Sequence, residues 1–120
     1  MSDTTLVELT PAEAKTLLDL GQAVLIDVRE PYEYGFERIP GALLFPLATF
    51  DPKALPSGGD KKILLHCGTA KRSGLAARRM IEAGVPVAYH VGGGLAAWKA
   101  AGLPLLGINP ATGAIEPKTV

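Results

Sequence analysis

The chain has 120 residues, 48% hydrophobic and 20% charged, and its 12 Lys and Arg residues balance its 12 Asp and Glu residues. This length suits one domain with a buried core, and the balanced charge gives no reason to expect nucleic acid or a membrane as a partner. No apolar run approaches the roughly 18 residues of a membrane span, and the N-terminus lacks the pattern of a secretory signal. One cysteine and two histidines make an internal disulfide or a thiolate zinc site implausible, so we expect a reduced thiol, a cytoplasmic location and no metal.

The first half of the chain alternates between predicted helix and strand. Thr10, Pro11 and Glu13 have the spacing of a capping box, which predicts a helix that ends near Gly21. Residues 24–28 (VLIDV) form a short apolar run typical of a strand that is covered on both faces. Three weaker elements follow: a short helix from Pro31 to Glu37, a strand over residues 42–45, and a loop or single helical turn over residues 50–57.

The second half continues the alternation. Residues 63–66 (ILLH) and 87–91 (VAYHV) predict two further buried strands. Residues 72–83 predict an amphipathic helix, and residues 93–101 predict a last helix with Trp98 on its apolar side. Strands that alternate with helices predict an α/β protein with parallel pairing and right-handed crossovers.

The C-terminal segment breaks this pattern. Residues 107–120 (GINPATGAIEPKTV) are rich in Pro, Gly and Thr, and we predict no regular element in them. We therefore divide the chain into a domain over residues 1–106 and a tail over residues 107–120. We expect that removing the tail leaves activity within a few-fold of that of the full chain.

Cys67, the only cysteine, lies between a predicted strand and a predicted helix. Ligands of parallel α/β sheets gather at the carboxyl ends of the strands. The free N–H groups at the start of the helix, together with Lys71 and Arg72, favour an anion and lower the pKa of a thiol. A lone cysteine is most often a small buried hydrophobic residue. Here the strand end, the loop that contains Gly68 and the two adjacent cations favour an activated nucleophile.

Three stretches of the chain resemble the rhodanese homology family of sulfurtransferases, and in particular its single-domain members. They are residues 25–42 (LIDVREPYEYGFERIPGA), residues 66–77 (HCGTAKRSGLAA) and residues 92–105 (GGGLAAWKAAGLPL). They occur in the order that the family has and together span most of the chain. The resemblance implies a three-layer α/β fold, in which helices flank both faces of a central, mainly parallel sheet.

The resemblance also implies a site and a reaction. Cys67 would take a sulfane sulfur from a donor such as thiosulfate, become a persulfide, and pass the sulfur to cyanide, a thiol or a sulfur-accepting protein, with no cofactor. The residues implied to surround the persulfide form the active loop: Gly68, Thr69, Ala70, Lys71, Arg72 and Ser73. We interpret three further matched residues as supports of this loop: Asp27, Arg29 and Glu30.

The sequence departs from the family pattern at three positions. Arg38 replaces a frequent histidine, Ala70 replaces a frequent glycine, and Gly68 replaces a frequent arginine. Ala70 must therefore place a Cβ in a tight loop. Lys71 is a candidate substitute for the cation that is missing at Gly68, so the preference for thiosulfate is less firmly implied than the chemistry of Cys67.

Two other functions compete with sulfur transfer. A phosphatase or arsenate reductase can use a similar loop, but in such loops the arginine follows the cysteine by C-x5-R, whereas Cys67 and Arg72 have the shorter C-x4-R spacing. A non-catalytic binding module is disfavoured by the presence of Cys67. A direct pair of His66 with Cys67 is not expected, because adjacent strand residues point to opposite faces. We interpret Tyr89 and His90 as packing residues.

Overall fold

The computed structural model describes residues 5–55 and 59–118, and its centre is a five-stranded sheet in which every pairing is parallel, in the order β1-β6-β5-β2-β4. The strands of this sheet are β1 (Thr5–Leu9), β2 (Ala23–Asp27), β4 (Leu43–Leu44), β5 (Lys62–His66) and β6 (Val87–Val91). The three central strands β2, β5 and β6 are apolar runs because both of their faces are covered. Their carboxyl ends meet at one edge of the sheet, which is the edge that carries Cys67.

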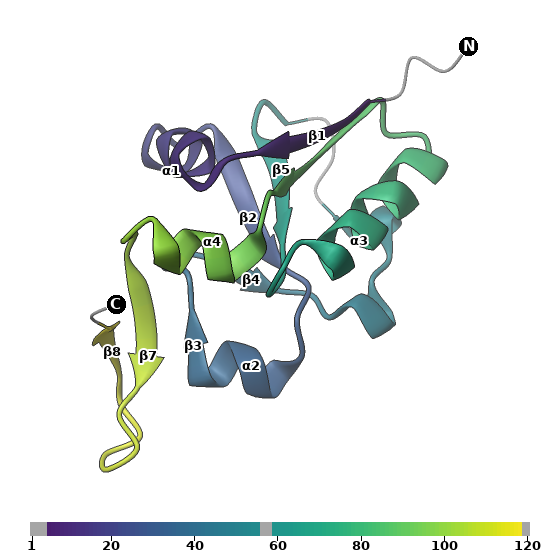
Figure 1. Ribbon diagram of the computed structural model, residues 1–120. Coiled ribbons are helices and arrows are strands. Elements are labelled where there is room, and N and C mark those ends of the chain that lie inside the picture. The colour runs from purple at the N-terminus through teal and green to yellow at the C-terminus, as the bar shows by residue number, and fades with distance from the viewer. Residues whose placement is uncertain (1–4, 56–58, 119–120) are drawn as a thin grey trace.

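Helices cover both faces of this sheet, so that the domain has three layers (Figure 1). α1 and α4 pack together on one face, and α3 packs on β5 and β6 on the other. The helices are α1 (Pro11–Asp19), α2 (Pro31–Phe36), α3 (Lys71–Glu82) and α4 (Gly94–Ala100), with the short 3-10 turns η1 (Leu47–Thr49) and η2 (Pro52–Ala54). The predicted capping box of α1 is confirmed, because Thr10 Oγ1 accepts from the N–H of Glu13 and the Glu13 carboxylate accepts from that of Thr10.

Successive side chains of the central strands point to opposite faces of the sheet and build two separate cores. Leu25 and Leu64 pack with Trp98 on the face of α1 and α4. Ile26 and Leu65 pack on the face of α3, together with its inward residues Ala76, Ala77 and Met80. Cys67 belongs to this second core and is fully buried. The nucleophile candidate therefore stands on a rigid strand end.

A second, smaller sheet contains the C-terminal segment and corrects one expectation. β7 (Leu105–Ile108) pairs antiparallel with β3 (Glu37–Arg38) and with β8 (Ile115–Lys118). The prediction that residues 107–120 hold no regular element is therefore wrong, and β7 and β8 form a hairpin that projects from the body of the domain (Figure 1). The physical reason is that strand pairing, more than side-chain burial, holds this hairpin: β8 is almost entirely exposed.

The predicted fold class is confirmed, and the main elements begin and end within about one residue of the expected positions. The sequence patterns did not reveal β1, which pairs with β6 at the edge of the sheet as far as the described residues show. The stretch predicted as loop or a single turn, residues 50–57, contains η2, while residues 56–57 lie outside the described part. Within that described part, no helix is both long and apolar enough to cross a membrane.

Candidate active site

The sulfur of Cys67 lies inside a turn of backbone N–H groups. The N–H of Ala70 donates to Sγ at 3.1 Å and the N–H of Ser73 donates to it at 3.3 Å. The Ser73 hydroxyl oxygen lies 3.7 Å from the same sulfur. The loop between β5 and α3 forms this turn because α3 begins at Lys71, so the unpaired N–H groups of its first turn point back at the thiol.

This arrangement favours the thiolate over the thiol. Burial opposes the charged form, but hydrogen bonds from the Ser73 N–H and hydroxyl and from the N–H groups of Thr69 and Ala70 outweigh it, so the pKa of Cys67 lies below its ordinary value. The contacts that lower it come from the loop itself. The same donors suit any anion that the sulfur carries, because they are fixed before the charge appears.

Ala70 adopts a backbone conformation that favours glycine. Its φ is +84°, and it is the only non-glycine residue with a positive φ among residues 5–55 and 59–118. A non-glycine residue in this region is strained, as expected at functional sites. The sequence departure at Ala70 is thus accommodated by strain, and the N–H of this strained residue is one of those that contact Sγ.

The start of α4 holds the loop from behind. The N–H of Leu95 donates to the carbonyl of Cys67 at 2.8 Å, and the N–H of Ala96 donates to that of Gly68 at 3.1 Å. A Cβ on Gly94 would lie 2.5 Å from the Cys67 carbonyl oxygen, so only glycine allows this close approach. The Gly-rich turn after β6 therefore fixes the position of the cysteine loop.

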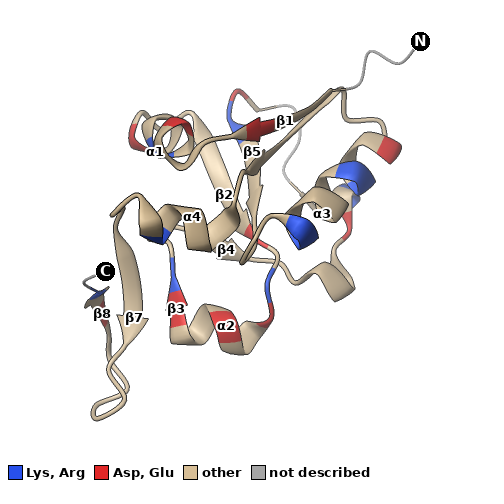
Figure 2. Cartoon of the chain, viewed as in Figure 1, with Lys and Arg blue, Asp and Glu red and all other residues tan. Residues whose placement is uncertain are grey.

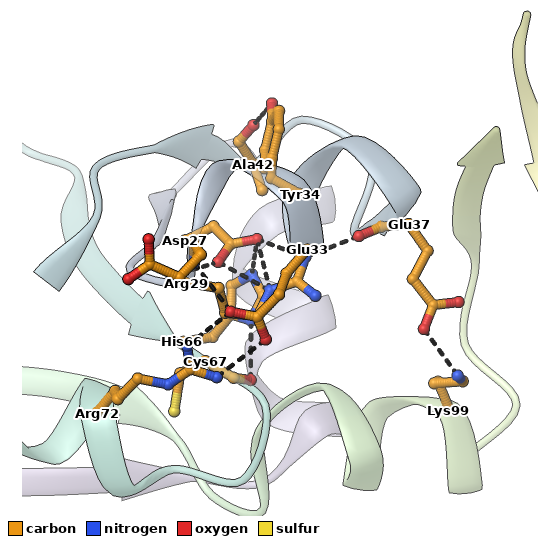
Figure 3. A network of polar contacts seen from close by, with 11 residues as sticks. Asp27, Arg29, Glu33, Tyr34, Glu37, Ala42, His66, Cys67, Arg72 and Lys99 are labelled. Atoms are coloured by element: carbon orange, nitrogen blue, oxygen red, sulfur yellow. Dashed lines mark hydrogen bonds and ion pairs between the residues drawn. The ribbon is translucent and has the colours of Figure 1, made fainter. Parts of the chain in front are cut away.

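Arg72 joins the loop to α2. Its guanidinium donates to the Glu33 carboxylate at 2.7 and 3.0 Å, and Figure 3 shows the two groups facing one another beside Cys67. Figure 2 shows the basic residues of α3 and the acidic residues of α2. Gly68 leaves room for the guanidinium, since a Cβ there would lie 3.3 Å from Nη2 of Arg72. Sequence reasoning missed Glu33. The available signal was its position three residues after Glu30, which is the spacing of a capping box.

Asp27 and Arg29 form a buried ion pair at the edge of the sheet that carries the loop. Asp27 accepts two hydrogen bonds from Nε of Arg29 and one from Nη2, at 2.8 to 3.0 Å, and lies 3.4 Å from Nε2 of His66. Burial opposes its charge, but the close contact with His66 and the hydrogen bonds from Arg29 outweigh this and hold the pKa of Asp27 far below its usual range. His66 points at Asp27 and the Cys67 carbonyl, so it forms no side-chain pair with the thiol.

The other predicted site residues lie around this centre. Glu30 precedes α2 and is exposed, and its N–H donates to Glu33. Lys71 is exposed and lines an open cavity of about 480 Å³ on the side of α3. Arg38 places its guanidinium 4.5 Å from the centre of the Tyr34 ring. Across the described ranges, no group of three or more His, Cys, Asp or Glu side chains could hold a metal ion.

His90 contacts the active loop, which the sequence did not indicate. Its Nδ1 lies 2.9 Å from the hydroxyl oxygen of Ser73, so this histidine has a polar partner as well as a packing role. Its Nε2 lies 3.5 Å from Glu8 of β1, a residue that sequence reasoning did not single out.

Comparison with known proteins identifies the family. The sequence model of the rhodanese-like domain family matches residues 10–101, so the chain belongs to this family. An uncharacterized protein of Synechocystis is 40% identical over 103 residues, which cover 86% of this chain and 58% of that protein. A probable adenylyltransferase/sulfurtransferase of Mycobacterium tuberculosis is 37% identical over 95 residues, 75% of this chain and 24% of that protein.

A solved structure supports the same assignment. The thiosulfate sulfurtransferase of Pseudomonas aeruginosa superposes with a TM-score of 0.74 at 27% sequence identity, over 83% of this chain and 20% of that one. The chain thus spans a little over half the length of the Synechocystis protein and about a quarter of the length of the Mycobacterium tuberculosis protein. These similarities place the chain in a family related to sulfur transfer and leave its substrate as a matter for proposal.

Proposed function

We propose that this chain is a sulfurtransferase that moves a sulfane sulfur through a persulfide on Cys67. The donor is a molecule such as thiosulfate, and the acceptor is cyanide, a thiol or a sulfur-accepting protein. The observation that carries the proposal is the turn of N–H donors around a buried sulfur whose pKa is lowered. Membership of the rhodanese-like family and the likeness to a thiosulfate sulfurtransferase support it.

The reaction has two displacement steps. The Cys67 thiolate attacks the outer sulfur of thiosulfate, so that a new S–S bond forms and sulfite leaves with the electron pair of the broken bond. The acceptor then attacks the terminal sulfur of the persulfide and releases the thiolate. Splitting the transfer in this way is nucleophilic catalysis, and the loop N–H groups stabilise the negative charge of the thiolate and of the persulfide.

The side chains around the loop have distinct proposed roles. Arg72, tied to Glu33, holds the shape of the loop. Lys71, whose side chain is exposed, attracts an anionic donor. Asp27 and Arg29 support the strand ends beneath Cys67, and Glu30 supports the start of α2. We further propose that the protein acts in the cytoplasm, where a single thiol remains reduced.

Intact mass spectrometry after incubation with thiosulfate tests the proposal. We expect the wild-type protein to gain the mass of one sulfur atom and to lose it when cyanide is added, with thiocyanate as the product. Cys67→Ala should show neither event while its circular dichroism spectrum is unchanged. Absence of the mass gain together with hydrolysis of an aryl phosphate would favour a phosphatase, and absence of both would favour a binding module.

A further inference from the structure

Behind the active loop, three polar side chains continue from the Cys67 sulfur to the surface. Ser73 Oγ lies 3.7 Å from Cys67 Sγ and 2.9 Å from His90 Nδ1. The other ring nitrogen of His90, Nε2, lies 3.5 Å from Glu8 Oε2. Ser73 and His90 are buried, whereas the Glu8 side chain is 63% exposed. The chain of contacts therefore begins at a buried thiol and ends at solvent.

The fold holds these groups in register. Glu8 of the edge strand β1 and His90 of β6 are direct partners in the parallel pairing of these two strands. Ser73 reaches the ring of His90 from the first turn of α3. Gly92 leaves room for Glu8, because a Cβ at this glycine would lie 2.8 Å from Cγ of that side chain. Backbone pairing between β1 and β6 therefore sets the position of Glu8 relative to His90.

We propose that His90 is a positioning residue for the Cys67 sulfur and acts on it through the Ser73 hydroxyl. Cys67, Ser73 and His90 exchange protons as one unit, and this unit reaches solvent beside Glu8. The proposal deepens the proposed function, on which it rests, by assigning the route by which the thiol loses its proton. When Cys67 is protonated, its S–H donates to Ser73 Oγ, and the hydroxyl of Ser73 donates to Nδ1 of His90.

The proton transfers in this unit balance. The thiol proton moves to Ser73 Oγ while the hydroxyl proton of Ser73 moves to His90 Nδ1. The products are a thiolate, an intact hydroxyl and an imidazolium whose Nε2–H faces Glu8. Loss of the Nε2 proton to water in the open cavity beside Glu8 then leaves neutral His90, which donates to Ser73, while Ser73 donates to the sulfur.

The surroundings of His90 suit a proton acceptor. The charged residues that line the cavity of about 480 Å³ together with it are Glu8 from β1 and Lys71 and Arg78 from α3, while β5 places Leu65 beside it. Burial lowers the pKa of His90 and Glu8 partly opposes this, so the ring is neutral and able to accept at neutral pH. The Ser73 hydroxyl also lies 3.2 Å from the carbonyl of Ala70, its alternative acceptor when His90 is absent.

Titration of the thiolate by its ultraviolet absorbance tests the proposal, with no sulfur donor present and with Cys67→Ala as the blank. We expect the wild-type curve between about pH 5 and about pH 9 to show two coupled steps, because the thiol and the imidazole titrate as a pair. His90→Leu should give one step with its midpoint raised by about one pKa unit, a tenfold loss of thiolate well below the midpoint. His90→Asn keeps a partner for Ser73 but cannot bind a proton, so it should also give a single step.

Nuclear magnetic resonance of the two histidine rings provides the reciprocal measurement. We expect the pKa of His90 to fall in Cys67→Ala, because the thiolate no longer favours the imidazolium, and to fall in Glu8→Gln, because a carboxylate that raises it is lost. Glu82→Gln, an exposed carboxylate at the other end of α3, is the control and should leave it unchanged.

Wild-type behaviour of the thiolate in His90→Leu would overturn the proposal. A two-step titration curve in His90→Asn, like that of the wild type, would also overturn it, because hydrogen bonding to Ser73 without proton exchange would then be sufficient to produce the two steps. A pKa of His90 that is the same in wild type and Cys67→Ala would have the same meaning. None of these measurements uses sulfur transfer, so failure to form a persulfide would refute the proposed function without affecting them.

Discussion

The guanidinium of Arg72 and the carboxylate of Glu33 form two hydrogen bonds, 2.7 and 3.0 Å long, between residues 39 positions apart in the sequence. The pair connects the first turn of α3, which supplies the N–H donors of the loop, to the first turn of α2. Arg72 thus connects the active loop to α2 in addition to placing a positive charge beside it. Its pKa is raised above the ordinary value, first by the hydrogen bond to Glu33 and against the effect of burial.

A double-mutant cycle on Arg72→Ala and Glu33→Ala should reveal this connection. We expect a coupling free energy of about 0.5–1 kcal/mol in urea unfolding, because the pair is bidentate but remains partly exposed. Arg72→Ala should also lower kcat for sulfur transfer, since the loop donors lose their support. Strictly additive free energies of unfolding would show that the two residues do not act together.

Lys71→Ala should mainly raise KM for thiosulfate. The side chain is exposed and has no shown contact with the sulfur, so its charge attracts the donor in ground and transition states alike. We expect an effect of about two- to fivefold at low salt that shrinks as the ionic strength rises. Lys61→Ala, an exposed lysine next to the start of β5, is the matched control. Equal KM values in the two variants would remove Lys71 from donor binding.

Ala70→Gly should stabilise the protein. A positive φ costs a non-glycine residue about 1–2 kcal/mol, and part of this gain is offset by the greater freedom of glycine in the unfolded chain, leaving about 0.5–1 kcal/mol. Urea unfolding measures the difference. Ala83→Gly, at a position with φ of −83°, is the control and should bring no gain. A loss of stability in Ala70→Gly would show that the loop is not strained at this residue.

Asp27→Asn should destabilise the fold by about 3–5 kcal/mol at neutral pH, because it leaves the buried Arg29 unpaired. The pH dependence follows from the lowered pKa of Asp27. Its contribution to the free energy of unfolding is fully present above the ordinary value of 3.8 and is lost as the pH falls through the native value. The difference in stability between wild type and Asp27→Asn should therefore shrink as the pH falls below about 4. Urea unfolding at several pH values measures it, and a difference that grows in acid would contradict this assignment.

Removal of residues 109–120 should leave turnover within a few-fold of that of the full chain, because this cut keeps β7 paired with β3. The hairpin contributes to stability instead: Lys118 donates to Glu37 at 2.6 Å and lies over the ring of Phe36. We expect a loss of about 1–2 kcal/mol in urea unfolding. Lys118→Ala in the full chain separates the ion pair from the pairing of strands. Loss of activity in a folded truncation would show that the hairpin shapes the site.

Much of the fold could be predicted from local patterns. The runs at residues 24–28, 63–66 and 87–91 predicted the three central strands because a strand that is buried on both faces must be apolar along its whole length. The capping box at Thr10 and the amphipathic pattern of α3 predicted helices for equally local reasons. Cys67 could be singled out as a candidate because a strand end followed by a helix start is itself a local feature of the chain.

Edge elements could not be predicted in this way. β1 and β8 are short and largely exposed, and β1 and the β7–β8 hairpin are ordered by backbone pairing with strands far away in the sequence. Such pairing leaves little mark on the choice of side chains. Pro117 in β8 even argued against a strand, although an edge strand tolerates proline.

By itself, the sequence determined the alternation of the central strands and helices along the chain, and it indicated Cys67 as the candidate nucleophile within a candidate active loop. Only the tertiary structure decided which side chains support that loop: Glu33 for Arg72, His66 for Asp27, and His90 with Glu8 behind Ser73. These partners come from separate elements, and their contacts depend on strand register and helix placement. A local sequence pattern determines which secondary structure a residue favours, whereas the packing of the whole chain determines which side chains it contacts.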